Sequence, residues 1–300
     1  MAYDIPILII AFNRPDVSKQ TFERIRQLKP SFLYVAIDGA RDNVIGEVDQ
    51  VEQVLSIYRD IDWPCSAKYK HNEKNLGAEV SVSGAVSWVL SEHDYCIVLE
   101  DDILATKAFF DFARQMLIRY KDAGNVYQIS AAQFTPMDTM KTDYVFSLYG
   151  HTGFGWATWK RAWSHFSLSL HDFDSTICNK TIKENYSCKQ AYNSFIRSVK
   201  KMKNRGSEYC SWDRCWSYVR NRDGGLSVVP RSNLNQNIGM WGLHANGLAD
   251  YHKFEGDNAF KVISHPSAVI IDKAYDKYHY WKYLHYSLLD KVKNKLKSIF

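Results

Sequence analysis

The feature that most constrains the fold is an alternation of buried strands and amphipathic helices over residues 5–130. The apolar run Ile5–Phe12 is rich in isoleucine and is typical of a strand that is buried on both faces. Two further apolar runs, Phe32–Ile37 and Tyr95–Leu99, follow it along the chain. Strand–helix–strand alternation predicts an α/β fold with a mostly parallel sheet, right-handed crossovers and flanking helices.

The segments between these strands carry apolar residues at helical spacing. We expect helices from Val17 to Leu28, over 51–58 and over 78–90, and a short strand near 67–70. A further helix is expected from Ile103 to Tyr120, because its apolar residues recur at i, i+4, i+7 and i+11.

Polar residues follow three of the expected strands at the point where each strand ends. These are Asn13-Arg14, Asp38-Gly39 and Glu100-Asp101-Asp102. Ligands of parallel α/β sheets bind outside the carboxyl ends of the strands. We therefore expect these three groups of residues to lie together at one edge of the sheet and to form a site there.

The second half of the chain has shorter segments and many aromatic residues. The 300 residues include nine Trp and nineteen Tyr, and such rings suit sugar ligands as well as cores and interfaces. We see no Pro/Gly/Ser-rich linker. We predict one domain in two halves, 1–134 and 135–274, and then an amphipathic basic helix in 275–300. Its apolar stripe consists of Leu284, Leu288, Val292 and Leu296.

Composition narrows the class of protein. Hydrophobic residues at 46% and charged residues at 24% are ordinary for a globular chain, and no apolar run approaches the roughly 20 residues that span a bilayer. The net charge of +5 suits phosphate-bearing partners or a membrane surface. The basic residues are spread along the chain, so we expect no nucleic-acid partner. Six cysteines without CxxC spacing, and no secretory leader, favour reduced thiols and a cytoplasmic protein.

The acidic triplet Glu100-Asp101-Asp102 is the sharpest candidate for chemistry. Three adjacent carboxylates at the end of a buried strand repel one another, so a cation or hydrogen-bond donors must offset the cost. Mg²⁺ or Mn²⁺, held by one or two carboxylates and by phosphate oxygens, would do so. The alternatives are a solvated turn, or acids at the N-terminus of the helix expected from Ile103.

Two other strand ends offer groups that suit a nucleotide. Arg14 can present a forked donor to a diphosphate, and Asp38 can accept from a nucleobase N–H, although an Asp-Gly turn is common. The chain has neither G-x-x-x-x-G-K-[ST] nor G-x-G-x-x-G after the first strand. A nucleotide bound here would therefore need a metal ion for its phosphates.

The second half holds two aromatic motifs. In the segment 153–159, glycines alternate with Phe154 and two tryptophans, which suits either ligand contact or a packed loop. Trp212-Asp213 precedes an apolar run, so Asp213 is a candidate general base, or else it caps a helix or pairs with Arg214 or Arg220. The histidines show no zinc-binding spacing, and His244 is a candidate further metal ligand.

In this order, the motifs resemble those of the GT-A nucleotide-sugar glycosyltransferases, and more narrowly the N-acetylglucosaminyltransferase I group. Val98-Leu99-Glu100-Asp101-Asp102 is similar to that group's Glu-Asp-Asp motif, 153–156 to its Gly-Leu-Gly-Trp, and 212–216 to its Trp-Asp-Asp-Trp. The resemblance runs from about Pro6 to about Asn237. Phe154 replaces a Leu and Arg214 replaces the second Asp, which leaves the donor sugar and the acceptor open.

The resemblance implies roles for particular residues. Asp213 would be the catalytic base, and Asp102 would bind the metal. Seven residues would bind the nucleotide sugar. Arg14 would contact the diphosphate, Asp38 the uracil, and Glu100 and Asp101 the ribose and donor sugar. Phe154 and Trp212 would line the sugar pocket, and Asn75 is the seventh residue of this set.

The function so implied is transfer of a sugar, with inversion, from a UDP-sugar to a hydroxyl of a glycan or lipid-linked saccharide. The cofactor would be Mn²⁺ or Mg²⁺, and the setting bacterial surface polysaccharide synthesis. The basic stripe in 284–300 would contact the inner membrane surface, or dock on its own domain with the lysines solvated. A metal-dependent phosphohydrolase and a non-catalytic carbohydrate-binding protein are the alternatives.

Overall fold

The computed structural model describes residues 3–205, 211–239, 241–242, 245–246 and 253–285. The main sheet is formed by eight strands, β1 (Ile7–Ala11), β2 (Phe32–Ile37), β3 (Ser66–His71), β4 (Tyr95–Glu100), β6 (Val126–Ser130), β7 (Tyr144–Ser147), β8 (Trp156–Trp159) and β9 (Leu226–Pro230). Two small sheets pair β5 (Ile103–Ala105) with β10 (Asn235–Asn237), and β11 (Trp241–Gly242) with β12 (Ala245–Asn246).

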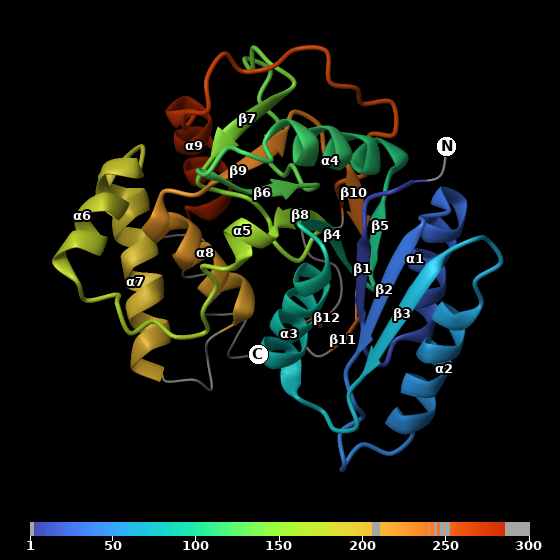
Figure 1. Cartoon of the computed structure of the whole chain (residues 1–300). Coiled ribbons are helices and arrows are strands. Elements are labelled where there is room, and N and C mark those ends of the chain that lie inside the picture. The colour runs from blue at the N-terminus through green and yellow to red at the C-terminus, as the bar shows by residue number, and fades with distance from the viewer. Residues whose placement is uncertain (1–2, 206–210, 240, 243–244, 247–252, 286–300) are drawn as a thin grey trace.

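The helices of the first half are α1 (Pro15–Leu28), α2 (Glu47–Arg59), α3 (Gly77–Glu92) and α4 (Lys107–Arg119). Those of the second half are α5 (Lys160–Trp163), α6 (Thr176–Asn185), α7 (Lys189–Arg205), α8 (Trp212–Asp223) and α9 (Lys273–His279), and a π-helical turn, η3 (Tyr280–Leu284), continues α9. In Figure 1, α1 and α2 cover one face of β1–β3, and α3 covers the other.

The strand order of the main sheet is β3-β2-β1-β4-β8-β6-β9-β7. Neighbours are parallel from β3 to β4 and between β6 and β9, whereas β8 and β7 run antiparallel to their neighbours. The chain is thus an α/β protein with a mostly parallel sheet flanked by helices, which confirms the predicted fold class. Strands β7, β8 and β9 come from the second half of the chain and extend the same sheet.

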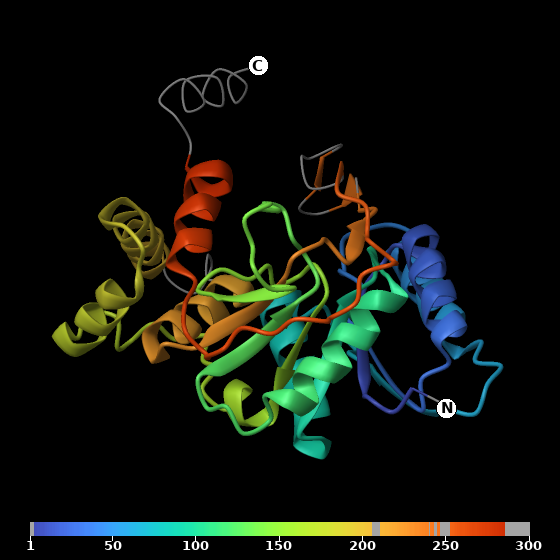
Figure 2. The same cartoon turned by 90° about the horizontal axis from the view of Figure 1, so that it is seen from above.

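The core lies along the central strands. Every residue of β1 and β6 is buried, as the apolar run Ile5–Phe12 predicts for the first of them. In Figure 2, residues 253–272 cross the molecule to α9, and Ile271 in this segment bridges to Phe146 of the edge strand β7. In the part of the chain that the structure describes, none of the helices combines the length and the apolar character needed to cross a bilayer.

Two expectations are corrected by the fold. The helix after the acidic triplet begins at Lys107, not at Ile103, because 103–105 pair with β10 and Thr106 caps the helix by accepting from the Phe109 N–H. The triplet therefore does not sit at a helix N-terminus. Cys215 is disulfide-bonded, whereas Cys65, Cys96 and Cys188 are free, so the expectation of reduced thiols is wrong for Cys215. Because disulfides persist mainly in oxidising compartments, cysteine usage no longer favours the cytoplasm.

Candidate active site

The register of the sheet brings the polar strand ends together. Ile10 on β1 pairs with Glu100 on β4, and Ala11 pairs with Ile37 on β2. The residues that follow each strand therefore leave the sheet side by side, at the carboxyl ends where ligands of such sheets bind. The predicted convergence of Arg14, Asp38 and the acidic triplet on one edge follows from this register.

Arg14 compensates part of the charge of the acidic triplet. Its Nη2 atom donates to Asp101 Oδ1, and its Nη1 atom lies 3.0 Å from Asp102 Oδ2. Burial lowers the pKa of Arg14, but the charges of the two carboxylates outweigh burial and raise it. Asp101 is further held by Thr21, whose Oγ1 donates to the Asp101 carbonyl at 2.6 Å. One guanidinium thus faces two carboxylates, and the cluster keeps an excess of negative charge.

One oxygen of Asp102 is left free by this arrangement. Asp102 is 7% exposed, and among the described residues its Oδ1 atom is buried without a hydrogen-bond partner. Gly239 lies directly against the other oxygen, so closely that a Cβ on it would overlap Asp102 Oδ2. A buried carboxylate oxygen without a donor is the kind of hard ligand that Mg²⁺ or Mn²⁺ takes.

The residues present fit a metal that depends on its substrate for further ligands. Within the described ranges, no three His, Cys, Asp or Glu side chains are grouped so that they could hold a metal ion by themselves. Mg²⁺ is commonly held by one or two carboxylates and by substrate phosphates. Asp102 would supply the carboxylate ligand of such a site. His244, the other predicted ligand, lies outside the described residues.

Glu100, the last residue of β4, lies close to the second half of the chain. Gly153, which has a φ of +89°, lies so close that a Cβ on it would be 3.2 Å from Glu100 Oε1. Burial raises the pKa of Glu100 well above its usual value, and the charges of Asp102, Asp101 and Asp213 raise it further. The carboxylate of Asp213 is therefore near enough to the triplet to act on it electrostatically.

Asp38 and Asn75 hold the loop between β3 and α3. The Asp38 carboxylate accepts hydrogen bonds from the backbone N–H groups of Leu76 and Gly77 and from Asn72 Nδ2. The distance from donor nitrogen to carboxylate oxygen is 3.0 Å in each of these three bonds. Asn75 Nδ2 donates to the Gly39 carbonyl at 2.8 Å. The structure thus places both residues at the predicted edge, where the contacts of Asp38 fix the loop. The nucleobase contact of Asp38 stays a prediction.

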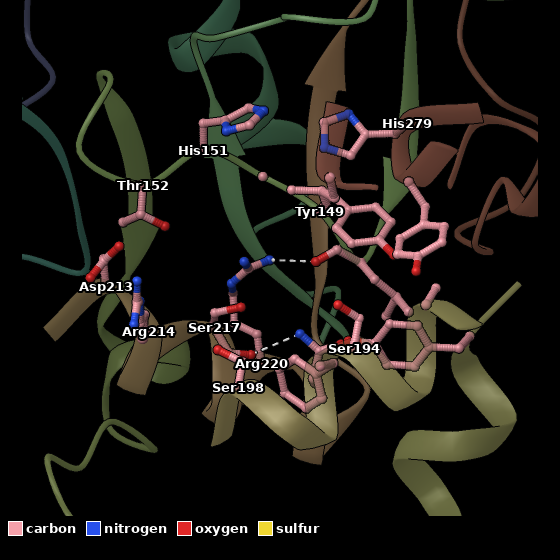
Figure 3. A pocket seen from close by; sticks show the side chains of 18 of the residues that line it. Tyr149, His151, Thr152, Ser194, Ser198, Asp213, Arg214, Ser217, Arg220 and His279 are labelled. Carbon is pink, nitrogen blue, oxygen red and sulfur yellow. Dashed lines mark hydrogen bonds between the residues drawn. The ribbon is translucent and has the colours of Figure 1, made fainter. Parts of the chain in front are cut away.

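A cavity of about 390 Å³ opens beside this edge, and Phe154 and Asp213 both line it. Its walls come from the loop 148–154, from α7 and α8, and from α9 with η3. Figure 3 shows Thr152 and Asp213 facing each other on one side of the cavity, with His151 and His279 on another. The structure thus brings two of the predicted second-half residues to one cavity.

Asp213 lies in the first turn of α8 and accepts from Ser211 Oγ at 2.5 Å. Among the described residues, neither Arg214 nor Arg220 forms an ion pair with it, in contrast to one of the alternatives raised from the sequence. Arg220 instead donates to the Leu148 carbonyl and to Ser227 Oγ. The carboxylate of Asp213 is half-buried and faces the cavity, which suits a group that exchanges a proton with a ligand.

Trp212 and Phe154 are placed differently. Trp212 is 6% exposed and stacks on Trp156 with 5.9 Å between ring centroids, and it does not line the cavity. Phe154 is half-buried, and its ring packs edge-on against Phe134 at 5.1 Å. Phe154 can therefore contact a ligand directly, whereas the structure gives Trp212 a packing position beneath the site.

Several residues of the cavity were not selected from the sequence. They are Tyr149, His151, Arg220 and His279, which come from three separate segments. A signal existed for Arg220, because it follows Trp216 by one helical turn on the buried face of α8, where a charged residue is unusual. His151 and His279 carried no such signal.

A comparison of the sequence with family models and with curated proteins finds no match. Among solved structures, HddC from Yersinia pseudotuberculosis is 13% identical, with a TM-score of 0.34 over 53% of this chain and 77% of that one. Mannose-1-phosphate geranyltransferase from Thermus thermophilus is 13% identical, with a TM-score of 0.35 over 76% and 74%. Mouse xyloside xylosyltransferase 1 is 8% identical, with a TM-score of 0.36 over 72% and 81%. Likenesses at this level do not specify an activity for the chain.

Proposed function

We propose that this protein is a metal-dependent, inverting glycosyltransferase of the GT-A type, which moves a sugar from a UDP-sugar to a hydroxyl of a glycan or lipid-linked saccharide. The observation that carries the proposal is the buried Oδ1 atom of Asp102, at the end of β4, which has no hydrogen-bond partner among the described residues. The charge of Asp213 acts on Glu100 of the same triplet and raises the pKa of that carboxyl. The acidic triplet at the end of β4 and the cavity that contains the Asp213 carboxylate are therefore close together. A transferase needs such neighbouring sites, because the donor and the acceptor must meet.

On the donor side, Asp102 would hold Mn²⁺ or Mg²⁺ together with the diphosphate. When bound, such an ion stabilises the negative charge that develops on the leaving diphosphate. Arg14 keeps Asp101 and Asp102 in place through its two ion pairs and adds positive charge beside the same group. Glu100 lies close to Gly153 of the second half of the chain, which suits contact with the donor sugar.

On the acceptor side, Asp213 would be the general base. The acceptor hydroxyl oxygen forms a bond to C1 of the donor sugar while the bond from C1 to the phosphate oxygen breaks. The hydroxyl proton passes to the Asp213 carboxylate, and UDP leaves with the electron pair of the broken bond. Attack from the face opposite the leaving group inverts the configuration at C1. A positioned base of this kind contributes roughly 10²–10⁴-fold to a rate.

The two alternatives raised from the sequence have less support. A phosphohydrolase would use further acids or histidines beside the triplet, and the described residues hold no such group of metal ligands. A carbohydrate-binding protein would not need an unpartnered carboxylate oxygen at the end of β4. The role in bacterial surface polysaccharide synthesis remains part of the proposal, and so does membrane contact through 284–300, of which 286–300 lie outside the described residues.

The proposal is tested by calorimetric titration of UDP with and without Mn²⁺. Wild type is compared with Asp102→Asn, which removes the charge and keeps the volume, and with Asp111→Asn, which removes an exposed carboxylate on α4. We expect Mn²⁺ to strengthen UDP binding at least tenfold in wild type and in Asp111→Asn, and Asp102→Asn to abolish that gain. UDP binding that ignores both Mn²⁺ and Asp102, or no UDP binding at all, would overturn the proposal.

A further inference from the structure

The cavity beside the strand ends contains a buried guanidinium that has no carboxylate partner among the described residues. Arg220 is 1% exposed, and its Nη1 atom donates to the Leu148 carbonyl at 3.4 Å and to Ser227 Oγ. Its Nε atom has no partner among the described residues. Among the described residues, Arg14 and Arg222 each form ion pairs with two carboxylates, whereas Arg220 forms an ion pair with none.

A buried charge without a partner is costly, so its presence calls for a compensating group. The carboxylate that acts on Arg220 from a distance is Asp276, on α9. Asp276 is itself bound by Ser147 Oγ and the Leu148 N–H, and burial raises its pKa to about 7, so it is a weak counterion near neutral pH. Burial also lowers the pKa values of His151 and His279, which keeps both rings neutral.

Other polar groups of the same cavity also lack partners. His151 Nε2 and Asn221 Oδ1 are buried and have no hydrogen-bond partner among the described residues. Three serines line the walls beside them, namely Ser194, Ser198 and Ser217. Figure 3 shows the guanidinium of Arg220 reaching into the cavity below Tyr149 and His151. Aromatic rings also line the cavity, including Tyr149, Phe154, Tyr186 and Phe195, and two charged side chains, Asp213 and Arg214, lie on α8 at one side of it.

The size and lining of the cavity define a class of ligand. About 390 Å³ lies within the range of small-molecule sites, which is roughly 300–1,000 Å³. Hydroxyl-bearing walls and aromatic faces suit a sugar ring, and an unpaired guanidinium suits a carboxylate or a phosphate, which it can bind in a bidentate manner. The cavity is therefore complementary to a sugar that carries one negatively charged group.

We propose that this cavity binds an anionic saccharide, with its carboxylate or phosphate group at Arg220, and that this saccharide is the acceptor whose hydroxyl faces Asp213. Binding of the anionic sugar depends on the cavity alone, whereas the acceptor role rests on the proposed function. Asp213 and Arg220 stand two helical turns apart on α8, so one rigid helix would position both ends of the acceptor.

The test is ligand binding by the full chain, measured by saturation-transfer NMR and calorimetry with three probes. Methyl glucuronide carries a carboxylate, glucose 1-phosphate carries a phosphate, and methyl glucoside is neutral. We expect at least one anionic probe to bind tenfold or more tightly than methyl glucoside, and the one that does so identifies the charged group. Equal binding of all three probes, or no binding of either anion, would overturn the proposal.

Variants assign the effect to Arg220. Arg220→Gln should abolish the preference for the anionic probe, whereas Arg24→Gln, which changes an exposed arginine on α1 that does not line the cavity, should keep it. If Arg220→Gln does not fold, Ser198→Trp blocks the cavity from the exposed side of α7 and should abolish binding of the probe. A preference that survives in folded Arg220→Gln, or in folded Ser198→Trp, would overturn the proposal.

UDP titration of the same wild-type protein separates the two proposals. Anion-selective binding without any UDP binding would support the cavity and overturn the donor site. Manganese-dependent UDP binding without anion selectivity would support the transferase and overturn the assignment of the cavity.

Discussion

Gly239 lies against the Asp102 carboxylate so closely that a Cβ at position 239 would overlap Asp102 Oδ2 and come within 3.0 Å of Arg14 Nη1. The segment after β10 thus closes over the ion pair of Arg14 and Asp102. The Ile238 N–H also donates to the Asp102 carbonyl at 2.9 Å, which fixes the backbone on both sides of the contact. The geometry of the acidic strand end therefore depends on a residue from the second half of the chain.

Gly239→Ala should disturb this site more than it disturbs the fold. The added methyl group must displace the Asp102 carboxylate, the Arg14 side chain or the backbone of 239, so we expect manganese-dependent UDP affinity to fall tenfold or more. Gly124→Ala is the matched control, because a Cβ there meets nothing within 4 Å, and its affinity should equal that of wild type. Calorimetry on both variants measures the effect, and wild-type affinity in Gly239→Ala would contradict it.

Asp38 should contribute measurably to stability. Its carboxylate accepts from Gly39, Asn72, Leu76 and Gly77, so Asp38→Ala leaves several donors of the loop before α3 without an acceptor. We expect a loss of about 3 kcal/mol in the free energy of unfolding by urea. Asp111→Ala, on an exposed face of α4, should change it by no more than about 0.5 kcal/mol. An Asp38→Ala protein with wild-type stability and no UDP affinity would assign Asp38 to the nucleobase instead.

How much of this could be predicted from the sequence differs between the halves of the chain. The strand Phe32–Ile37 was predicted with the bounds that the structure shows, because a uniform apolar run between polar breaks has one interpretation. The convergence of Arg14 and Asp102 was also predictable, since parallel topology fixes where strand ends lie. Their ion pair was not predicted, although a need for compensating donors was.

The errors arose where distant segments decide local structure. The start of α4 was misplaced because Ile103–Ala105 continues an apolar pattern, and its pairing with β10 joins residues that are far apart along the chain. The disulfide at Cys215 and the meeting of His151, Arg220 and His279 around one cavity are tertiary contacts of the same kind. Periodicity and motif spacing carry no information about such contacts.

Asp276 should make stability depend on pH. Burial raises the pKa of its carboxyl from 3.8 to about 7, although hydrogen bonds from Ser147 and Leu148 and the charge of Arg220 oppose this. The folded state therefore keeps a proton that the unfolded chain loses above about pH 4, so this contribution to stability is present below pH 4 and is lost as pH rises to about 7. Asp276→Asn resembles the protonated carboxyl and should flatten the decline.

Urea unfolding at intervals between about pH 4 and about pH 8 measures this dependence. Wild type and Asp276→Asn should differ more at the upper end of this range than at the lower, with the variant the more stable at the upper end. Asp111→Asn removes an exposed carboxylate and should follow the wild-type curve. Parallel curves for wild type and Asp276→Asn would show that Asp276 does not titrate in this range.

Asp213→Asn should separate catalysis from donor binding. The amide cannot accept the acceptor's proton, so we expect the rate of sugar transfer to fall by about 10²–10⁴-fold. UDP affinity with Mn²⁺ should change by less than threefold, because Asp213 lies in the cavity and Asp102 holds the diphosphate side. Ser211→Ala removes the hydroxyl that donates to Asp213 and leaves the carboxylate, so it should cost far less than Asp213→Asn. Transfer at the wild-type rate by Asp213→Asn, with UDP binding intact, would remove Asp213 from the role of base.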